Sequence, residues 1–245
     1  MVLPAELQAR VDALPWYHQL DLAPGVRTPG VNNPALTLPR LGLPDDLSGL
    51  TVLDIGAWDG AWSFEMERRG ARRVLATDSY SWGHGGWGTK AAFELAREAL
   101  GSHVEDRTID LFDLSPETVG TFDVVLFLGV LYHLRDPLGA LERVASVTAG
   151  WAVVETEVDL MLLRRPAAAF YPADELNADP TNWWGLNPTA VSGALRTAGF
   201  SRVELVWQRS LPARVGGWAK HRLTPSRRRL SDALNRNRAV FHARK

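Results

Sequence analysis

Residues 51–60 read TVLDIGAWDG, and this stretch decides the fold of the chain. A short apolar run leads into Asp54, two glycines follow at Gly56 and Gly60, and a helical pattern begins directly after them. A buried strand that ends in a glycine turn and leads into a helix is typical of a nucleotide-binding site. Glycine lets the backbone approach the ligand, and the first helical turn offers unpaired N–H groups. The stretch therefore predicts a site for a nucleoside cofactor.

The composition is that of an ordinary globular protein. Of 245 residues, 46% are hydrophobic and 22% are charged, which suffices for one sizeable core and a small appended region. The absence of cysteine excludes disulfides, thiolate metal sites and cysteine catalysis. No apolar run approaches the roughly 18 residues that span a bilayer, and no signal-peptide pattern opens the chain. We therefore expect a cytoplasmic protein without a membrane partner, and no His, Asp or Glu spacing predicts a metal site.

The charge is distributed unevenly along the chain. Residues 209–245 hold eleven basic residues and one acidic residue, Asp232, so this region carries a net charge of +10 although the whole chain carries −1. A basic region of this kind binds nucleic acid or an acidic substrate, or it is simply a solvated face. Both interpretations stay open from the sequence.

Strand and helix signals alternate regularly from residue 50 onward. Repeated strand–helix units of this length predict a doubly wound, Rossmann-like α/β sheet with helices on both faces. One helix is expected to begin with Asp136 as its N-cap and to bury Leu138, Leu141 and Val144. The strands are predicted over residues 51–55, 73–77, 103–109, 124–128, 151–158 and 202–207, with a final edge strand over 238–243.

The same signals divide the chain into three parts. Residues 1–45 are rich in proline, with one short helix over 5–14, and are expected to cap the active site as an extended segment. Residues 46–208 form the core, in which 160–184 is irregular. Residues 209–245 are a basic insertion and the final strand of the same domain, with one helix over 226–234.

Acidic residues close three successive strands, at Asp54, Asp78 and Asp110. In a sheet of this kind a ligand lies across the carboxyl ends of the strands. Asp78 follows Asp54 at nearly the spacing at which an acid binds a ribose diol, and Asp110 is placed to accept a hydrogen bond from the amine of an adenine. These acids strengthen the prediction of a nucleoside site.

Four motifs together resemble the class I S-adenosylmethionine-dependent methyltransferases, and most closely the branch that includes the bacterial tRNA wobble-uridine carboxymethyltransferases. They are VLDIGAWDG at 52–60, ATD at 76–78, Ile109–Leu111 and FDVVLFLGVLYHLRDPLGAL at 122–141. The resemblance covers about residues 14–207. It implies a seven-stranded, mostly parallel sheet with an antiparallel edge strand, and S-adenosyl-L-methionine bound at the first four strands.

The resemblance also implies a role for each matching residue. Gly56, Ala57 and Asp59 are expected to contact the methionine part, Asp78 and Ser79 the ribose, and Asp110 and Leu111 the adenine, while Gly129 and Tyr132 flank the cofactor. Asp54, at the end of the first strand, is a further cofactor-binding candidate.

Two departures from the family pattern affect this interpretation. Trp58 stands where the family often has glycine, so we expect the loop to turn the indole outward. The carboxymethyltransferases hold the extra carboxylate of their cofactor with lysines before the first strand, but residues 1–89 contain no lysine. Arg27 and Arg40 remain alternatives for that charge. Plain S-adenosylmethionine is favoured, and tRNA is correspondingly less favoured as the substrate.

Two histidines are candidate catalytic residues, because methyl transfer to a hydroxyl needs positioning and a base. His133 follows the fourth-strand motif, and His18 lies in the aromatic N-terminal segment. His133 is alternatively a structural residue. The candidate substrate-binding residues, each of which is alternatively a packing residue, are Tyr17, Trp82, Trp87, Glu155, Tyr171, Asn182 and Trp183.

The sequence is compatible with three functions. The leading one is methyl transfer to a small-molecule acceptor, a hydroxyl of a sugar or natural product, since ten tryptophans suit an acceptor held between aromatic faces. The second is tRNA wobble-uridine (carboxy)methyl transfer, with the basic region on the phosphates. The third is a catalytically silent binding module built on the same scaffold.

Overall fold

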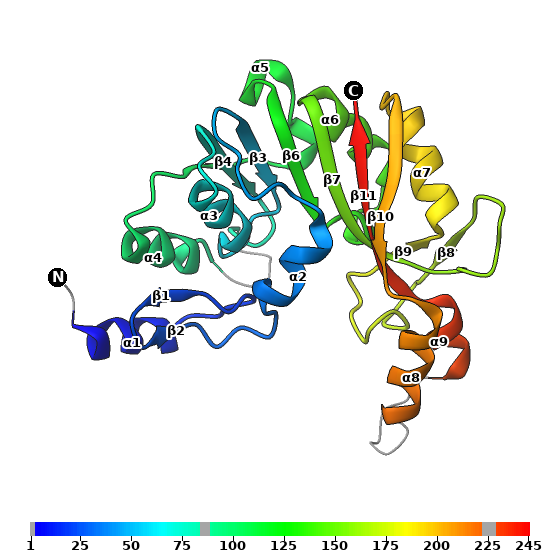
Figure 1. Ribbon diagram of the computed structural model, residues 1–245, viewed down its shortest axis with the longest axis horizontal. Coiled ribbons are helices and arrows are strands. Elements are labelled where there is room, and N and C mark those ends of the chain that lie inside the picture. The colour runs from blue at the N-terminus through cyan, green and yellow to red at the C-terminus, as the bar shows by residue number, and fades with distance from the viewer. Residues whose placement is uncertain (1–2, 84–88, 222–228) are drawn as a thin grey trace. The chain divides into compact units, whose positions relative to one another are not determined.

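The structure is a computed structural model, and it describes residues 3–83, 89–221 and 229–245 (Figure 1). The chain divides into two compact units. Unit 1 comprises residues 1–126 and 147–150, and unit 2 comprises residues 127–146 and 151–245. Two strands, β6 (Phe122–Leu128) and β7 (Thr148–Val158), contribute residues to both units.

The N-terminal part of unit 1 holds more regular structure than its prolines predict. Its elements are α1 (Pro4–Asp12), β1 (Asp21–Ala23), β2 (Val26–Arg27) and α2 (Pro34–Leu41). The short first helix is confirmed, but the hairpin and α2 were not expected. Helix α2 begins where the Asn33 side chain accepts a hydrogen bond from the N–H of Ala35 and proline occupies the first helical position, a combination that favours helix initiation.

The sheet of unit 1 carries the glycine loop. Its further elements are β3 (Thr51–Ile55), α3 (Ala61–Arg68), β4 (Arg73–Asp78), α4 (Ala91–Leu100), β5 (Glu105–Thr108), the 3-10 helix η1 (Leu111–Asp113) and α5 (Pro116–Val119). Strand β3 lies between β6 and β4, and β5 follows β4. The β3–β4 and β4–β5 pairs are parallel, as predicted. The N–H and hydroxyl of Thr51 both donate to one carboxylate oxygen of Asp123, at 2.8 and 2.7 Å, which ties the start of β3 to β6.

Strand β3 is covered on both faces. Val52 and Leu53 point to opposite sides of the strand, and both are fully buried. Continuous apolar runs of this kind are required when helices cover both faces of a parallel sheet. Helices α3 and α4 follow β3 and β4 in the chain (Figure 1).

Unit 2 is built on antiparallel strands. Its elements are the 3-10 helix η2 (Leu131–His133), α6 (Pro137–Ser146), β8 (Ala168–Phe170), β9 (Trp184–Leu186), α7 (Pro188–Thr197), β10 (Arg202–Gln208), α8 (Leu211–His221), α9 (Leu230–Asn235) and β11 (Asn237–Arg244). Strand β11 lies between β7 and β10 and runs antiparallel to both.

The antiparallel edge pair of the predicted fold is therefore present, but β10 rather than the final strand forms its edge. The expectation of an edge position for residues 238–243 was wrong. Phe241 and Val240 are 0% and 1% exposed, whereas most of β10 is exposed. Apolar side chains buried on both faces belong to an inner strand. The pattern of residues 238–243 resembles that of an edge strand, but Ala239, Val240 and Phe241 are consecutive and all buried.

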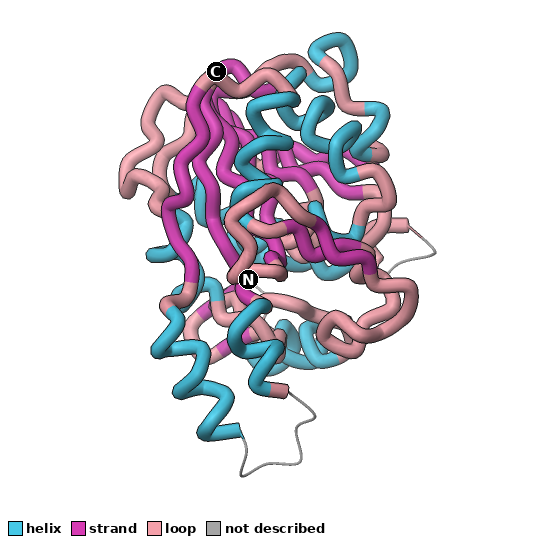
Figure 2. The backbone as a smooth tube through the Cα atoms, turned by 90° about the vertical axis from the view of Figure 1, so that its right-hand side faces the viewer, coloured by secondary structure: helices cyan, strands magenta, loops and turns pink. Residues whose placement is uncertain are grey.

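The helices of unit 2 confirm part of the prediction. The Asp136 carboxylate accepts a hydrogen bond from the N–H of Gly139 at 2.9 Å at the start of α6, as expected of an N-cap. Leu141 and Val144 are buried, but Leu138 is 49% exposed, because it lies in the first turn at the margin of the buried face. Helix α8 was not predicted. It neighbours α9 in Figure 2, and the first residues of the helix expected over 226–234 lie outside the described residues.

The fold class predicted from the sequence is confirmed. The chain has a mostly parallel central sheet with helices around it and an antiparallel pair at one edge. Within the described residues, seven strands lie on its main path; β9 pairs with β7 beside this path, and β8 pairs with β9. None of the helices described has the length and apolar character that a membrane crossing requires.

Candidate active site

The glycine loop of unit 1 has an unusual backbone. Gly56, Trp58 and Gly60 all have positive φ angles, of 80°, 49° and 83°. A Cβ atom added at Gly60 would lie 2.5 Å from the ring of Phe64 and 2.6 Å from that of Phe93. Gly60 is therefore required both by its conformation and by the closeness of the two rings.

Trp58 is held in its left-handed conformation from three sides. Its N–H donates to the Asp78 carboxylate at 3.0 Å, and its carbonyl accepts from the indole N–H of Trp82 at 2.6 Å. Its ring stacks on that of Tyr17, with the centroids 4.6 Å apart. These contacts offset the roughly 1–2 kcal/mol that a left-handed conformation costs a residue other than glycine. The indole thus leaves the loop and packs on the N-terminal segment.

Asp54 is buried at the end of β3. It is 1% exposed, and its Oδ2 accepts a hydrogen bond from the hydroxyl of Ser63 at 2.6 Å. Burial raises the pKa of Asp54 to about 6, although the Ser63 hydrogen bond and the charge of His18 act in the opposite direction. A cationic ligand bound beside the loop would favour the ionised form of this buried carboxyl group.

Replacing Asp54 by asparagine is expected to change how stability depends on pH. Because the folded pKa exceeds the unfolded one, this carboxyl group stabilises the protein below about pH 4, and that contribution is lost as the pH rises to about 6. Asp54→Asn should therefore raise the free energy of unfolding by up to about 3 kcal/mol at neutral pH and leave it unchanged below pH ~4. Urea unfolding over a pH series measures this difference, and parallel pH curves for the two proteins would contradict it.

Asp59 fastens the N-terminal segment to the loop. Its Oδ2 accepts hydrogen bonds from the backbone N–H groups of Tyr17 and His18, at 2.9 and 2.7 Å, and its Oδ1 lies 2.6 Å from His18 Nδ1. Both side chains are buried. Burial would raise the pKa of Asp59, but the charge and hydrogen bonds of His18 lower it below the ordinary value. Asp59 and His18, assigned separately to cofactor and catalysis, thus form one pair.

The residues expected at the ribose and adenine also lie together. The Asp78 carboxylate accepts from the N–H groups of Trp58 and Ser81, at 3.0 and 2.8 Å, which fixes its orientation. Burial raises the pKa of Asp78. The hydroxyl of Ser79 donates to Asp110 Oδ2 at 3.3 Å, so β4 and β5 bring these two predicted residues into contact. The neighbouring Leu111 is buried.

This set of side chains fits a nucleoside cofactor. Ribose hydroxyls and an adenine amine are donors, and the ends of β3, β4 and β5 offer carboxylate acceptors with buried apolar neighbours. In the described part of the chain, no group of three His, Asp or Glu residues is arranged to hold a metal ion.

Trp82 and Trp87 are the two tryptophans predicted at the rim of the site. Trp82 is 8% exposed, donates to the loop carbonyl of Trp58, and has the ammonium group of Lys90 5.0 Å from its ring centroid. Trp87 and the neighbouring His84 lie in the segment 84–88, outside the described residues.

In unit 2, Gly129 lies beside a charged cluster. Its φ is 75°, and an added Cβ would lie 3.4 Å from Arg238 Nη2 and 3.7 Å from the hydroxyl of Tyr132. The same Nη2 donates to that hydroxyl at 3.4 Å. The two residues expected to flank the cofactor therefore share one arginine as neighbour.

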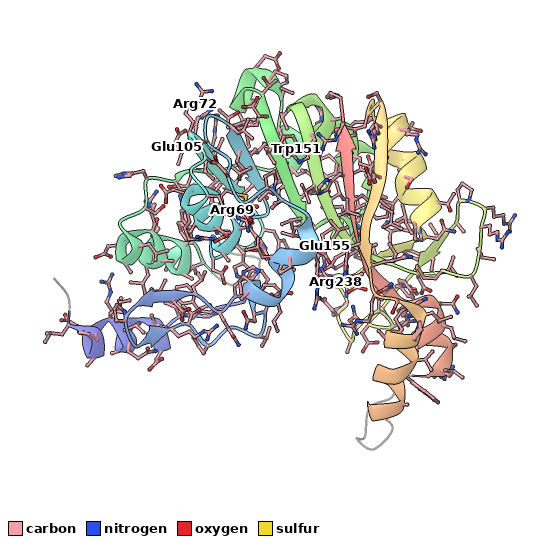
Figure 3. All side chains as sticks on the ribbon, viewed as in Figure 1. Arg69, Arg72, Glu105, Trp151, Glu155 and Arg238 are labelled. Atoms are coloured by element: carbon pink, nitrogen blue, oxygen red, sulfur yellow. The ribbon has the colours of Figure 1, made fainter. Side chains whose placement is uncertain are left out.

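Glu155 is paired with Arg238, which the sequence reasoning missed. Arg238 Nη2 donates to Glu155 Oε2 at 2.6 Å, Nε bonds the other oxygen, and Nη1 donates to Glu157 at 3.2 Å. Figure 3 shows Glu155 and Arg238 directed toward each other from β7 and β11. Burial opposes the charge of Arg238, but Glu155 raises its pKa above the ordinary value. No local signal links residues 83 positions apart.

His133 is bound to a later segment of unit 2. Its Nδ1 lies 3.1 Å from the carbonyl oxygen and 2.9 Å from the hydroxyl of Thr181. Burial lowers the pKa of His133 to about 4, so the ring is neutral at physiological pH. A neutral imidazole can accept a proton, but a pKa of about 4 makes this one a weaker base than an ordinary histidine.

The remaining substrate candidates lie in the segment after β7. The hydroxyl of Tyr171 bonds the carboxylate of Asp159, and burial together with this bond raises the pKa of Tyr171. Asn182 is 2% exposed, and its amide donates to the Leu176 carbonyl at 2.8 Å. Among the described residues, its buried Oδ1 has no hydrogen-bond partner, which leaves one acceptor unsatisfied.

Trp183 links this segment to η2. Its backbone N–H donates to the carbonyl of Tyr132 at 2.9 Å. Its indole ring lies 4.8 Å from the guanidinium of Arg135 and stacks on the ring of Phe170 at 6.3 Å. Packing therefore fixes the aromatic side chain that the sequence offered as an acceptor contact.

Comparisons with known proteins identify one family. The model of a family described as a methyltransferase domain matches residues 33–205. Curated relatives include the tRNA U34 carboxymethyltransferases of Desulforapulum autotrophicum and Colwellia psychrerythraea. Both are 28% identical, over 169 and 166 residues that cover 65% and 66% of this chain and 48% of each relative. The chain thus spans about half the length of the curated relatives it matches.

Solved structures share the fold. The N-terminal domain of EvdMO1, crystallised in the presence of SAH and D-fucose, has a TM-score of 0.70 at 22% identity, covering 100% of this chain and 97% of that one. The cyclase SpnF has a TM-score of 0.57 at 18% identity, covering 86% and 80%. The family inferred from the four motifs is therefore confirmed, and it is a family that uses S-adenosylmethionine as methyl donor.

Proposed function

Because this chain belongs to the methyltransferase domain family, we propose that it transfers a methyl group from S-adenosylmethionine to a small-molecule acceptor, a hydroxyl of a sugar or natural product. The observation that carries the proposal is the set of acidic residues that unit 1 places at three neighbouring strand ends, Asp54, Asp78 and Asp110. When bound, S-adenosylmethionine supplies a methyl group on a positively charged sulfur, which makes the group ready for displacement.

The protein's own residues bind the cofactor and orient it. Asp78 and Ser79 hold the ribose hydroxyls, and Asp110 with Leu111 holds the adenine. The left-handed glycines Gly56 and Gly60 bring the loop backbone close to the methionine end. Such positioning supplies much of the rate enhancement in an in-line displacement, because reactants held in line lose little further entropy on the way to the transition state.

Three observations support a small, hydroxyl-bearing acceptor. In unit 1, the aromatic side chains of Tyr17 and Trp82 suit the apolar face of a sugar or a polyketide-like ring. The unsatisfied Oδ1 of Asn182 offers an acceptor for a hydroxyl. EvdMO1, whose N-terminal domain matches this chain over its whole length, was crystallised with D-fucose.

The alternative is a tRNA acceptor, supported by the names of the curated relatives and by the basic region 209–245. Two observations weigh against the carboxylate-bearing cofactor of those relatives. Residues 1–89 contain no lysine, and Arg27 lies 3.4 Å from Asp21. In unit 2, Arg238 is already paired with two carboxylates, those of Glu155 and Glu157.

Binding of S-adenosylhomocysteine, measured by titration calorimetry, tests the cofactor. Asp78→Asn is expected to weaken binding by about tenfold or more, because it replaces a charged acceptor of the ribose hydroxyls by a neutral one. Glu142→Gln, an exposed carboxylate on α6, is the matched control and should leave the affinity unchanged. Wild-type protein that is folded and does not bind the ligand would refute the proposal.

Methyl transfer from radiolabelled S-adenosylmethionine separates the two acceptors. We expect turnover with hydroxylated sugars or natural products and little dependence on salt. The tRNA alternative instead requires labelled tRNA, an affinity that falls steeply with salt, and its loss when Arg227, Arg228 and Arg229 are replaced by serine.

A further inference from the structure

Two residues of the N-terminal segment contact two consecutive residues of the glycine loop, all within unit 1. The ring of Tyr17 stacks on that of Trp58, with the centroids 4.6 Å apart and the planes 9° from parallel. The imidazole of His18 lies 2.6 Å from Asp59 Oδ1, and Asp59 Oδ2 accepts the backbone N–H groups of both segment residues. The segment therefore holds the loop through one aromatic pair and three hydrogen bonds.

These contacts extend to the carboxylate that is proposed to hold the ribose. The N–H of Trp58 donates to Asp78 at 3.0 Å, and its carbonyl accepts from the indole of Trp82 at 2.6 Å. Trp58 has a φ angle of 49°, a conformation that costs a residue other than glycine free energy and persists only where the surroundings enforce it. The ring of Tyr17 is one of the contacts that enforce it, so the segment influences the backbone donor that orients Asp78.

Residues 17–32 are braced against one another by backbone hydrogen bonds. The N–H of Asn32 donates to the Tyr17 carbonyl at 2.9 Å, and the N–H of Gln19 donates to the Asn32 carbonyl at 2.8 Å. Between these two bonds, His18 and Asn32 form a β-bridge. A displacement of the two residues that touch the loop therefore involves the whole of residues 17–32.

Both contact residues of the segment lie outside the part of the chain that matches the methyltransferase domain family, which begins at residue 33. The match therefore assigns neither Tyr17 nor His18 a role at the cofactor. Because Asp59 is 0% and His18 is 5% exposed, separating them leaves buried polar groups without partners. The docked arrangement is thus preferred over small displacements, and the geometry of the loop depends on the segment.

We propose that Tyr17 and His18 are positioning residues for the cofactor: they hold the glycine loop in the conformation that binds S-adenosylmethionine, so that cofactor binding and docking of residues 17–32 strengthen each other. This inference rests on the proposed function, which places the cofactor at the loop. A loop that is already ordered loses less conformational entropy when its ligand binds, which raises the affinity without a new contact to the ligand. By linkage, the bound cofactor stabilises the docked segment by the same factor.

Hydrogen exchange of the wild-type protein tests the coupling without any substitution. The amide hydrogens of Tyr17 and His18 are bonded to Asp59, and that of Asn32 to the Tyr17 carbonyl, so they exchange when the segment opens. We expect saturating S-adenosylhomocysteine to slow their exchange about threefold or more, because the ligand favours the docked segment. Exchange of residues 17–32 that is the same with and without the ligand would overturn the proposal.

Substitutions on the segment side show which contacts carry the coupling, because Trp58 and Asp59 belong to the loop itself. Tyr17→Ala removes the aromatic pair and should weaken the binding of S-adenosylhomocysteine by about threefold to tenfold, the size of effect that one such pair contributes. Tyr17→Phe keeps the ring and should recover most of the affinity. His18→Phe keeps a ring beside Trp62 without the hydrogen bond to Asp59, and it should also weaken binding by about threefold or more.

The matched control is Val31→Ala, because Val31 lies in the same segment and is 85% exposed. It should change neither the affinity nor the exchange of residues 17–32. A folded Tyr17→Ala variant whose segment exchanges faster but which binds the ligand as tightly as the wild type would show a structural role only, and would contradict the proposal. A folded wild type that does not bind the ligand at all would instead refute the proposed function, and this inference with it.

Discussion

Replacement of Asp59 by alanine is expected to lower the free energy of unfolding by about 3–5 kcal/mol, one of the two largest single effects we predict. The carboxylate accepts three hydrogen bonds, from two backbone N–H groups and from the imidazole of His18. Its removal leaves these donors in a dry environment, since Asp59 and His18 are 0% and 5% exposed. An unsatisfied buried donor costs about 1–3 kcal/mol, so the three together account for a loss of this size.

The structure offers little room for the segment to adjust. A Cβ at Gly30 would lie 2.3 Å from the backbone of His18, which means that residues 17–18 and 30 already pack at the closest distance that two backbones allow. The hydroxyl of Thr28 also donates to the His18 carbonyl at 2.6 Å. We therefore expect loss of Asp59 to release the N-terminal segment as a unit rather than to shift single side chains.

Urea unfolding followed by tryptophan fluorescence measures the effect, because Trp58 and Trp62 lie beside the pair. Asp59→Asn keeps an acceptor oxygen without the charge and should lose less than Asp59→Ala. Asp45→Ala, whose side chain is fully exposed and 3.4 Å from Arg69, is the matched control and should leave the stability essentially unchanged. An Asp59→Ala variant as stable as that control would show that the pair does not hold the segment.

Replacing Arg238 by methionine is expected to cost about 3–5 kcal/mol, the range found when one partner of a buried ion pair is removed. Methionine has an apolar side chain like the stem of arginine. The decrease in the free energy of unfolding therefore measures the loss of the guanidinium charge. The side chain of Glu155 is only 9% exposed, and its carboxylate would lose the guanidinium that contacts both of its oxygens. Arg238 itself is 37% exposed, which places the expected cost toward the lower end.

A double-mutant cycle distinguishes the ion pair from simple packing. Glu155→Gln alone and Arg238→Met alone should each destabilise the protein. The double variant should be more stable than the sum of the two losses indicates, by about 1–3 kcal/mol, because neither charge is then left alone. Strictly additive losses would mean that the two side chains contribute independently, contrary to the contact seen between β7 and β11.

The sequence determined the fold class, and it predicts the candidate residues of the cofactor site, because both predictions rest on local signals. The glycines of residues 51–60 favour a left-handed turn through their local conformational freedom. Apolar runs of four to seven residues likewise indicate buried strands without reference to distant contacts. Acidic residues at the ends of parallel strands meet at one edge of the sheet by geometry alone. The contact between Ser79 and Asp110 is the outcome of that rule.

The partners of these residues depended on tertiary structure. Asp59 meets His18 across 41 positions, His133 meets Thr181 across 48, and Glu155 meets Arg238 across 83. The sequence identified each of these residues without its partner or did not identify it at all. The residues next to a side chain in the sequence do not indicate which distant segment will contact it. The exposure of Leu138 and the inner position of β11 were decided in the same way, by which faces other elements cover.

What the sequence by itself determined about this protein is thus the fold class and the methyltransferase family, and it predicts a nucleoside site at the end of β3. What only the tertiary structure decided is the surroundings of those residues: Asp54 is buried with a raised pKa, Asp59 is paired with His18, and Glu155 is paired with Arg238. The physical reason is that backbone conformation follows short-range sterics and hydrogen bonding, whereas pKa values, ion pairs and tautomers depend on burial and on charges brought from far along the chain.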